Sequence, residues 1–539
     1  MAAKQLSAAR AIRRFAFRQT IRGALIIGVL GGLMMGSYGT IIVKTYPTQK
    51  ERDALVATLN ATPAINFLSG EVKNAAQPAS YAIYKSLPMM VLITAIWGLM
   101  TTTRLLRGNE EDGRAELIES GRTTKGRAAT QLLAGYGYAV AIGGIVMWVL
   151  TAALGAAPGV NLSLLEALYL VLACFLPGLV FAGIGVMTSQ LAATRGRAIM
   201  YGLIPLLVLY CIRGAANTTS DIDWLKKLTP FGWSDLLNAV LAPQPLWIIP
   251  PLIFAGLFTV LGLVWAARRD YGVSLLRQAE EVRSRFYLLG SPLAFMIRQK
   301  QWTFFWWLVG TLCFVSFMAA LSGTVSDLLH DTSLSLGSLG AMSVDQIKLF
   351  FIGSTFMILG LVLFAFTILE IGSIRREEAK SYLDNILVAP VGRTTWLTRR
   401  LVVLATMILL IALISVAVIL AIANAQDIGL SLSDTLRSLA GAFAGIVLVL
   451  GVGAFLYGIL PRVAVAVMTV VVAWAFIVDI VRGLFQLSDW IEKTSLLYYI
   501  PSDPSKSPLW SGVAWLVGIG ICLLAAGIIL FTKRDIITE

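Results

Sequence analysis

The chain has little of what catalytic and metal sites need. Its 539 residues include one histidine, His330, and four cysteines, none of them in a Cys-x-x-Cys spacing. Histidine is the commonest general base, and zinc sites need grouped His and Cys, so the sequence offers almost no material for either. The cysteines, which lie in or at the edge of apolar runs, are expected to be small core residues: Cys174, Cys211, Cys313 and Cys522. We expect no catalytic residue and no metal.

Charged residues are also scarce. Asp, Glu, Lys and Arg make up 14% of the chain, hydrophobic residues make up 57%, and the mean hydropathy is +0.79. This composition excludes an ordinary soluble domain. Runs of about 20 apolar residues can cross a bilayer, and roughly twelve runs meet that length. They lie near 21–43, 87–106, 130–154, 165–190, 198–214, 246–267, 302–323, 349–372, 401–424, 437–459, 463–483 and 510–531. We therefore predict an all-α integral membrane protein.

The distribution of Lys and Arg predicts the orientation. Most of the 43 basic residues fall before the first span, in the loops that follow the even-numbered spans, and after the last span. Basic residues favour the cytoplasmic side, so the N- and C-termini are expected in the cytoplasm. The net charge of +13 is then explained by topology and contact with anionic lipid. A nucleic-acid partner is not expected, since no soluble basic groove with interleaved aromatics exists.

One charged segment, Arg104 to Arg127, stands between two apolar runs and reads RLLRGNEEDGRAELIESGRTTKGR. Asn109 can cap a helix, and Glu110 and Arg114 are four residues apart, which favours an ion pair on a helix. Ala115 and Ile118 form a small apolar stripe. The pattern predicts a short amphipathic helix over 109–120 that lies against the membrane or a partner protein. For one such loop, a solvated helix is the simpler interpretation.

The same motif returns in the second half of the chain, which favours a functional role. Residues 375–400 read RREEAKSYLDNILVAPVGRTTWLTRR. The two halves correspond at Glu110-Glu111 and Glu377-Glu378, at Glu116 and Asp384, and letter for letter at 121–124 and 392–395. Ser381-Tyr382 stands where Gly113-Arg114 stood. The chain therefore carries two diverged copies of one charged loop.

Other features repeat with similar spacing. Arg213-Gly214 and Arg482-Gly483 each precede a short segment rich in Trp or Tyr, and both halves end on basic residues followed by Asp, at 268–270 and 533–535. Six spans in each half give both copies the same orientation, which makes a parallel repeat. The predicted organisation is a first half, 1–270, a cytoplasmic linker, 271–290, and a second half, 291–539. Within them we expect an interfacial helix at 7–20, coupling segments at 109–120 and 375–393, and outer re-entrant segments at 214–245 and 484–509.

Two weaker signals have local explanations. Asp479 and Arg482 are three residues apart near the end of a span, and an ion pair between them is favoured over a proton relay. Gly108-x4-Gly113 resembles a phosphate-binding loop, but Arg114-Ala115 replaces the required Lys-Ser/Thr and no strand precedes it. We expect no nucleotide site in this chain.

The segment EEDGRAELIESGRTTKGR resembles the cytoplasmic coupling helix of ABC exporter membrane subunits of the type-2 permease superfamily. More narrowly, the chain resembles the duplicated twelve-span exporters of polyketide antibiotics and other drugs. In that family each half has an interfacial helix, a coupling helix between its second and third spans, and outer re-entrant helices between its fifth and sixth. All three features occur twice here, so the resemblance covers essentially the whole chain.

The resemblance implies a function as the transmembrane subunit of an ATP-driven exporter in the bacterial cell membrane. A separate ABC ATPase subunit, in two copies and binding ATP and Mg²⁺, would dock on the coupling helices, while this chain itself holds no cofactor. The substrates would be hydrophobic or amphipathic compounds moved outward. The implied contacts with the ATPase are Glu110, Glu111, Gly113, Arg114, Glu116, Arg122, Glu377, Glu378, Asp384 and Arg393.

The resemblance also places the second and fifth spans of each half at the substrate pathway, which here means Trp97, Tyr201, Phe364 and Trp474. Aromatic side chains give hydrophobic compounds a large contact area, but the same rings could pack between helices or face lipid. The alternative function is a proton-coupled secondary transporter of the major facilitator kind, which also has six plus six spans. Against it, the charged loop lacks that family's Gly-x3-Asp-Arg-x-Gly-Arg order.

Overall fold

The computed structural model describes residues 2–60, 63–70, 77–119, 124–218, 220–240, 242–270, 273–276, 287–288, 290–331, 344–379, 383, 392–484 and 488–535. Within these ranges the regular elements are helices, and no strand occurs. Eleven of the helices are long and apolar enough to cross a membrane. The prediction of an all-α membrane protein is confirmed. The chain divides into two compact units, Met1–Val282 and Arg283–Glu539, and each is described by itself.

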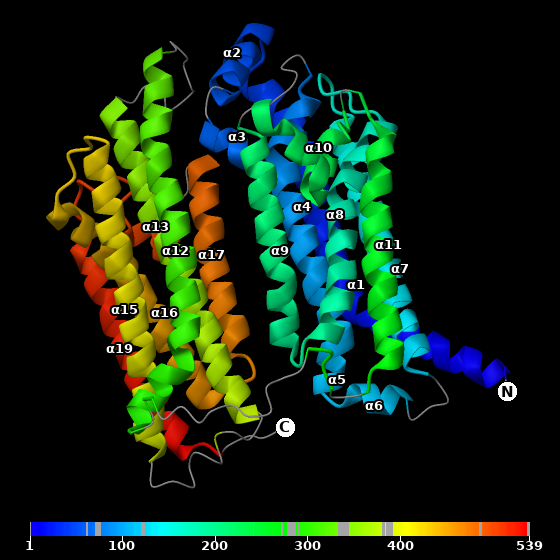
Figure 1. The fold of residues 1–539 in the computed structure, drawn as a ribbon. Helices are drawn as coiled ribbons and strands as arrows, with labels where there is room; N and C mark the ends of the chain where they lie inside the picture. Colours follow the sequence, from blue (N-terminus) through cyan, green and yellow to red (C-terminus); the bar gives the residue numbers. More distant parts are fainter. Residues whose placement is uncertain are drawn as a thin grey trace. The chain divides into compact units, whose positions relative to one another are not determined.

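The first unit is built from long helices packed side by side (Figure 1). Its α-helices are α1 (Ala2–Thr45), α2 (Gln49–Asn60), α3 (Pro63–Ser69), α4 (Ala79–Thr103), α5 (Asn109–Glu111), α6 (Arg114–Glu119), α7 (Lys125–Gly155), α8 (Leu164–Leu191), α9 (Arg195–Ala216), α10 (Pro230–Leu236) and α11 (Ile249–Arg268). Helix α1 packs mainly against α7, and α4 packs mainly against α8. Helix α8 is the most buried of the spanning helices, so it forms the centre of this unit.

Glycine lets these helices approach closely. A Cβ atom on Gly98 of α4 would lie 2.4 Å from the carbonyl oxygen of Gly178 on α8. The same distance would separate a Cβ atom on Gly28 of α1 from the carbonyl oxygen of Gly143 on α7. Helices in a membrane associate through such small residues, because lipid gives no hydrophobic driving force between them.

The second unit contains α12 (Pro292–Asp331), α13 (Val344–Ala379), α15 (Arg393–Ala425), α16 (Leu432–Ile459), α17 (Ala464–Leu484), α18 (Asp489–Glu492) and α19 (Trp510–Lys533). Helix α16 packs closely on α19, where a Cβ atom on Gly451 would lie 2.2 Å from the carbonyl oxygen of Gly520. The largest hydrophobic core of this unit joins α13, α15 and α16 and includes Phe364, Trp396 and Tyr457. The unit therefore has a core of its own.

Corresponding helices begin with the same local device. Ser163 precedes α8, and its side chain accepts a hydrogen bond from the backbone N–H of Glu166, whose carboxylate accepts in return from the backbone N–H of Ser163. Ser431 and Asp434 form the same capping box at the start of α16. Such a box satisfies backbone donors that a helix start would otherwise leave unpaired.

Two expectations about the spans need adjustment. The segment 7–20, predicted as an interfacial helix, is helical and forms part of α1, which is continuous from Ala2 to Thr45; its interfacial position stays a prediction. The predicted span at 463–483 is occupied by α17, whose apolar stretch Ala464–Asp479 is shorter than the other eleven. No proline or glycine-rich break separates the interfacial segment from the span, so one helix can continue through both.

The two ends of the first unit differ. Helices α2, α3 and α10 gather at one end, and α5 and α6 lie at the other (Figure 1). At the end with α10, Arg213 donates from Nε and Nη2 to the two carboxylate oxygens of Asp235, at 2.6 and 2.9 Å, and from Nη1 to the carbonyl oxygen of Leu68, at 2.8 Å. In the second unit the predicted Asp479–Arg482 ion pair is confirmed, at 3.2 Å. Arg213 thus joins three elements, whereas the ion pair of Arg482 is with a residue of the same helix.

Candidate functional site

The charged loop of the first unit begins with a π-helical turn. Helix α4 continues into Arg104–Gly108, where the backbone N–H of Asn109 reaches the carbonyl oxygen of Arg104. Single π turns inside helices are rare and are frequent at functional sites. After α5, Gly113 takes a φ of +69°, a conformation that favours glycine, and α6 begins at Arg114. The helix predicted at 109–120 is therefore two short segments with a break between them.

Glu110 is held inside the protein by two arginines. Its carboxylate lies 2.6 Å from Arg107 Nη1 and 2.5 Å from Arg269 Nη2, and its side chain is only 11% exposed. Arg107 belongs to the π turn, and Arg269 follows directly on α11. Arg107 also donates from Nε to the carbonyl oxygen of Ala193, at 2.9 Å. We call Arg107, Glu110 and Arg269 the first clamp.

Helical spacing predicts an ion pair between Glu110 and Arg114, and this prediction is wrong. Arg114 pairs with Asp112 at 3.4 Å instead, and both of these side chains are half-exposed. The break at Gly113 removes the continuous helix on which residues four apart would share a face. Glu110 therefore binds Arg107 in the preceding π turn and Arg269 at the end of α11.

The second unit contains an equivalent clamp. Glu378, near the end of α13, is completely buried and lies 2.6 Å from Arg534 Nη2, and Arg534 follows directly on α19. We call Glu378 and Arg534 the second clamp. Its neighbour Glu377 forms an ion pair with Arg400 of α15. In each unit, a carboxylate at or shortly after the end of the second long helix thus binds the arginine that follows the last long helix.

The start of the next helix strengthens both clamps. Lys125, at the first position of α7, donates from Nζ to the carbonyl oxygen of Arg269, at 3.2 Å. Arg393, at the first position of α15, donates from Nη1 to the carbonyl oxygen of Arg534, at 3.0 Å. A basic residue near a helix C-terminus satisfies carbonyl groups that lack intrahelical partners. Three helices therefore meet at each clamp.

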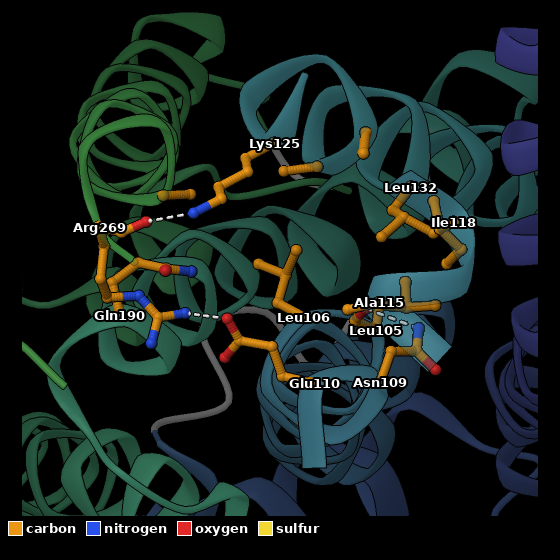
Figure 2. Close-up of a pocket in the computed structure, with 13 residues that line it drawn as sticks. Leu105, Leu106, Asn109, Glu110, Ala115, Ile118, Lys125, Leu132, Gln190 and Arg269 are labelled. Carbon is orange, nitrogen blue, oxygen red and sulfur yellow. Dashed lines mark hydrogen bonds and ion pairs between the residues drawn. The ribbon is translucent and has the colours of Figure 1, made fainter. Parts of the chain in front are cut away.

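Helix α6 has one anchored face and one exposed face. Figure 2 shows Ala115 and Ile118 pointing toward Leu132 of α7 at the edge of a hollow of about 50 Å³. On the other face, Glu116 is exposed and Leu117 is 75% exposed. Single exposed apolar side chains are common on protein surfaces, so the exposure of Leu117 alone assigns no partner to this face.

The predicted partner contacts fall into three groups. Gly113, Arg114 and Glu116 are exposed, and so is Glu111, whose carboxylate accepts a hydrogen bond from the backbone N–H of Arg195 at 2.6 Å. The side chains used inside the protein are those of Glu110, Glu377, Glu378 and Arg393. Arg122 and Asp384 lie outside the described residues.

Sequence reasoning missed the cationic members of the clamps, Arg107, Arg269 and Arg534, and it also missed Arg400. A signal for two of them existed, because both halves end on an arginine followed by aspartate, at 269–270 and 534–535. That repetition was interpreted only as evidence of duplication. It also marked the residues that bind the repeated carboxylates.

The four predicted pathway rings have different surroundings. Trp97 lines a cavity of about 830 Å³ and its ring centroid lies 5.4 Å from that of Tyr136. Tyr201 is exposed, and so is Trp474, whose Nε1 donates to Thr494 Oγ1 at 2.9 Å. Phe364 is completely buried in the core of its unit. Only Trp97 stands at a cavity of substrate size among the described residues.

Comparison with known proteins agrees with the pattern of loops and spans. Residues 289–532 match the family described as the C-terminal domain of the multidrug efflux system permease Rv1217c. The chain is also 27% identical, over 524 residues, to the multidrug efflux system permease protein Rv1217c of Mycobacterium tuberculosis (strain ATCC 25618 / H37Rv). That alignment covers 93% of this chain and 90% of the relative. With its eleven membrane-spanning candidates and these matches, the chain is similar to multidrug efflux permeases in its second half and along most of its length.

Proposed function

We propose that the chain is the membrane subunit of an ATP-driven exporter, which moves hydrophobic or amphipathic compounds out of a bacterial cell. A separate ABC ATPase, in two copies that bind ATP and Mg²⁺, supplies the energy. The observation that carries the proposal is the exposed face of α6, with Glu116 and Leu117 outward, on a loop fixed by a buried ion-pair clamp. The repeated clamp of the second unit supports a second docking loop.

The clamp suggests how force would pass from the partner into the membrane. Glu110 connects the loop to Arg107, which continues α4, and to Arg269, which ends α11. A push on α5 and α6 would therefore displace the ends of two membrane helices together. Mostly buried ion pairs resist separation, because removing a partner leaves an uncompensated charge. The loop would then act as a rigid lever, with the termini and both loops on the cytoplasmic side.

The partner contact can be tested at Leu117. The substitution Leu117→Asp places a charge on the exposed face of α6 and is expected to reduce ATPase co-purification and drug-stimulated ATP hydrolysis. Leu117→Met is the matched control, because it keeps an apolar side chain of similar volume. The fold should be unaffected in both variants, since exposed substitutions change stability by about 0.5 kcal/mol or less.

Two results would contradict the proposed function. One is sustained ATP hydrolysis by the isolated chain, with contaminating ATPases excluded. The other is drug export that a proton gradient alone drives in vesicles without any ATPase, which is the behaviour of a secondary transporter. Equal ATPase binding by Leu117→Asp and Leu117→Met would instead remove α6 as the docking element.

A further inference from the structure

The cavity beside Trp97 lies at the end of the first unit that carries the charged loop. It measures about 830 Å³, within the range of about 300–1,000 Å³ typical of small-molecule sites. Three elements form it: the part of α1 around residues 18–27, the last turns of α4 with the π turn, and the first residue of α9. Its volume is therefore large enough for a drug-sized or lipid-like ligand.

One side of the cavity is apolar. Ile27, Ile96 and Met100 line it together with the indole of Trp97. Gly23 of α1 allows this indole to lie against the helix, because a Cβ atom there would be only 2.6 Å from Trp97 Nε1. The indole makes no hydrogen bond with a described residue, and its Nε1 edge lies against α1 at Gly23. This side suits a hydrocarbon or aromatic body.

The other side is strongly cationic. Arg18 and Arg22, four residues apart on α1, line the cavity with Arg104 and Arg195, and none of the lining residues is acidic. Over the part of the chain that the structure describes, the four guanidinium groups form no ion pair with a carboxylate; Arg18, Arg22 and Arg104 are exposed, and Arg195 is partly buried. Arg195 Nε is buried and makes no hydrogen bond. An unpaired buried donor on a cation is costly, which calls for an anionic ligand.

Neighbouring cations show that this arrangement is specific. Arg107, three residues after Arg104, is neutralised by Glu110. In the second unit, Lys300 near the start of α12 forms a 2.6 Å ion pair with Glu370 of α13. Mostly buried cations in both units, Arg107 and Lys300, are thus paired with carboxylates, whereas the partly buried Arg195 forms no ion pair. Nearby Glu111 is engaged by the backbone N–H of Arg195 and does not line the cavity.

We propose that this cavity binds an amphiphile with an anionic head, a carboxylate or a phosphate, on the four arginines and an apolar body against Trp97. Two sources share that chemistry: an anionic membrane lipid and an anionic exported compound. The second gives the substrate class of the proposed function and rests on it. The binding itself is a property of the permease alone.

The test uses the full-length permease in a neutral detergent, without the ATPase. The probe is 11-(dansylamino)undecanoic acid, whose fluorescence rises in an apolar site, and its methyl ester is the uncharged control. We expect the acid to bind at least about tenfold more tightly than the ester. Arg104→Gln and Arg195→Gln should each weaken acid binding about tenfold, the effect of losing one charge-assisted hydrogen bond. Ester binding should not change.

Two exposed arginines provide matched controls. Arg14 lies on α1 one turn before Arg18, and Arg197 lies on α9 two residues after Arg195, and neither lines the cavity. Arg14→Gln and Arg197→Gln should bind the acid normally. Equal binding of acid and ester would overturn the proposal. So would an equal loss in the control variants, because diffuse surface charge would then explain the binding.

A second experiment separates the two sources. Displacement of the acid by phosphatidylglycerol but not phosphatidylcholine, with no transport of the acid, identifies a lipid site. ATP-dependent accumulation of the acid in everted vesicles that contain the permease and its ATPase identifies cargo. If no ATPase binds the permease but the acid still binds through the arginines, the binding site in the cavity is supported and the proposed function is refuted.

Discussion

Replacing Glu110 by glutamine removes the only carboxylate of the first clamp. Arg107 and Arg269 are 3% and 6% exposed, so both guanidinium groups would lose an anion in a site with little access to water. Removing one partner of a buried pair costs about 3–5 kcal/mol. Arg107 keeps its hydrogen bond to the carbonyl oxygen of Ala193, and Arg269 keeps one to that of Val273, but both lose their anion and the link between α4 and α11 through Glu110 is lost. The loop should then detach from α11.

The same loop offers a matched control. Asp112 and Arg114 form an ion pair at 3.4 Å in which both side chains are half-exposed, and such pairs contribute about 0–1 kcal/mol. For a domain of 150–250 residues, 1 kcal/mol changes the melting temperature by about 2–4 °C. Glu110→Gln should therefore lower the melting temperature of the first unit by about 6 °C or more. Asp112→Asn should lower it by less than about 4 °C.

A buried thiol supplies the assay. Cys174 on α8 is completely buried, whereas Cys211, Cys313 and Cys522 are exposed and can be replaced by alanine. A thiol-reactive coumarin then reports the temperature at which the core of the first unit opens. In the double variant Glu110→Gln/Arg269→Gln part of the loss should be recovered. Equal melting temperatures for Glu110→Gln and Asp112→Asn would refute the argument that the clamp stabilises the unit.

The rings and the inter-helix contacts give three further predictions. Phe364→Ala should lower membrane abundance and reduce export of all compounds together, because losing a buried phenylalanine costs about 3–5 kcal/mol. Trp97→Ala should instead change the ranking of exported compounds at near-normal abundance. Drug-resistance profiles, measured together with immunoblots of the membrane fraction, check both. Arg213→Gln should increase protease cleavage at the end with α10 more than Arg482→Gln does, since its carboxylate partner is on another helix. Gly98→Val should abolish accumulation of folded protein, measured by gel filtration, because its side chain would meet α8 backbone.

Repetition in the sequence was enough to locate the two charged loops. The tetrapeptide at 121–124 returns at 392–395, and the acidic pair at 110–111 returns at 377–378, each after an apolar run. Helix α6 and the end of α13 do lie in the predicted segments. Apolar runs and local repeats are properties of neighbouring residues, so no tertiary structure is needed to find them.

The partner of Glu110 could not be predicted in the same way. Helical spacing proposes Arg114, which is close in sequence, but the π turn and the left-handed Gly113 end the regular helix on both sides of Glu110. Of its actual partners, Arg107 lies three residues before Glu110, whereas Arg269 is brought near by the packing of α4 and α11 on α8, which hydropathy does not predict. The four pathway rings show the same limit, because Phe364 and Trp97 look alike in sequence and differ only in what surrounds them.

The clamps also constrain the order in which the membrane protein is made. Glu110 leaves the ribosome 159 residues before Arg269, and Glu378 leaves it 156 residues before Arg534. At about 5–20 residues per second, each carboxylate waits roughly 10–30 s for this later arginine. Its other cationic partner, Arg107 or Arg375, lies three residues earlier and is already made. During that interval the loop is free to meet chaperones or quality-control proteases. Insertion of the last helix of each unit is thus the event that completes the clamp of that unit. The first half can therefore be complete before synthesis of the second half has begun.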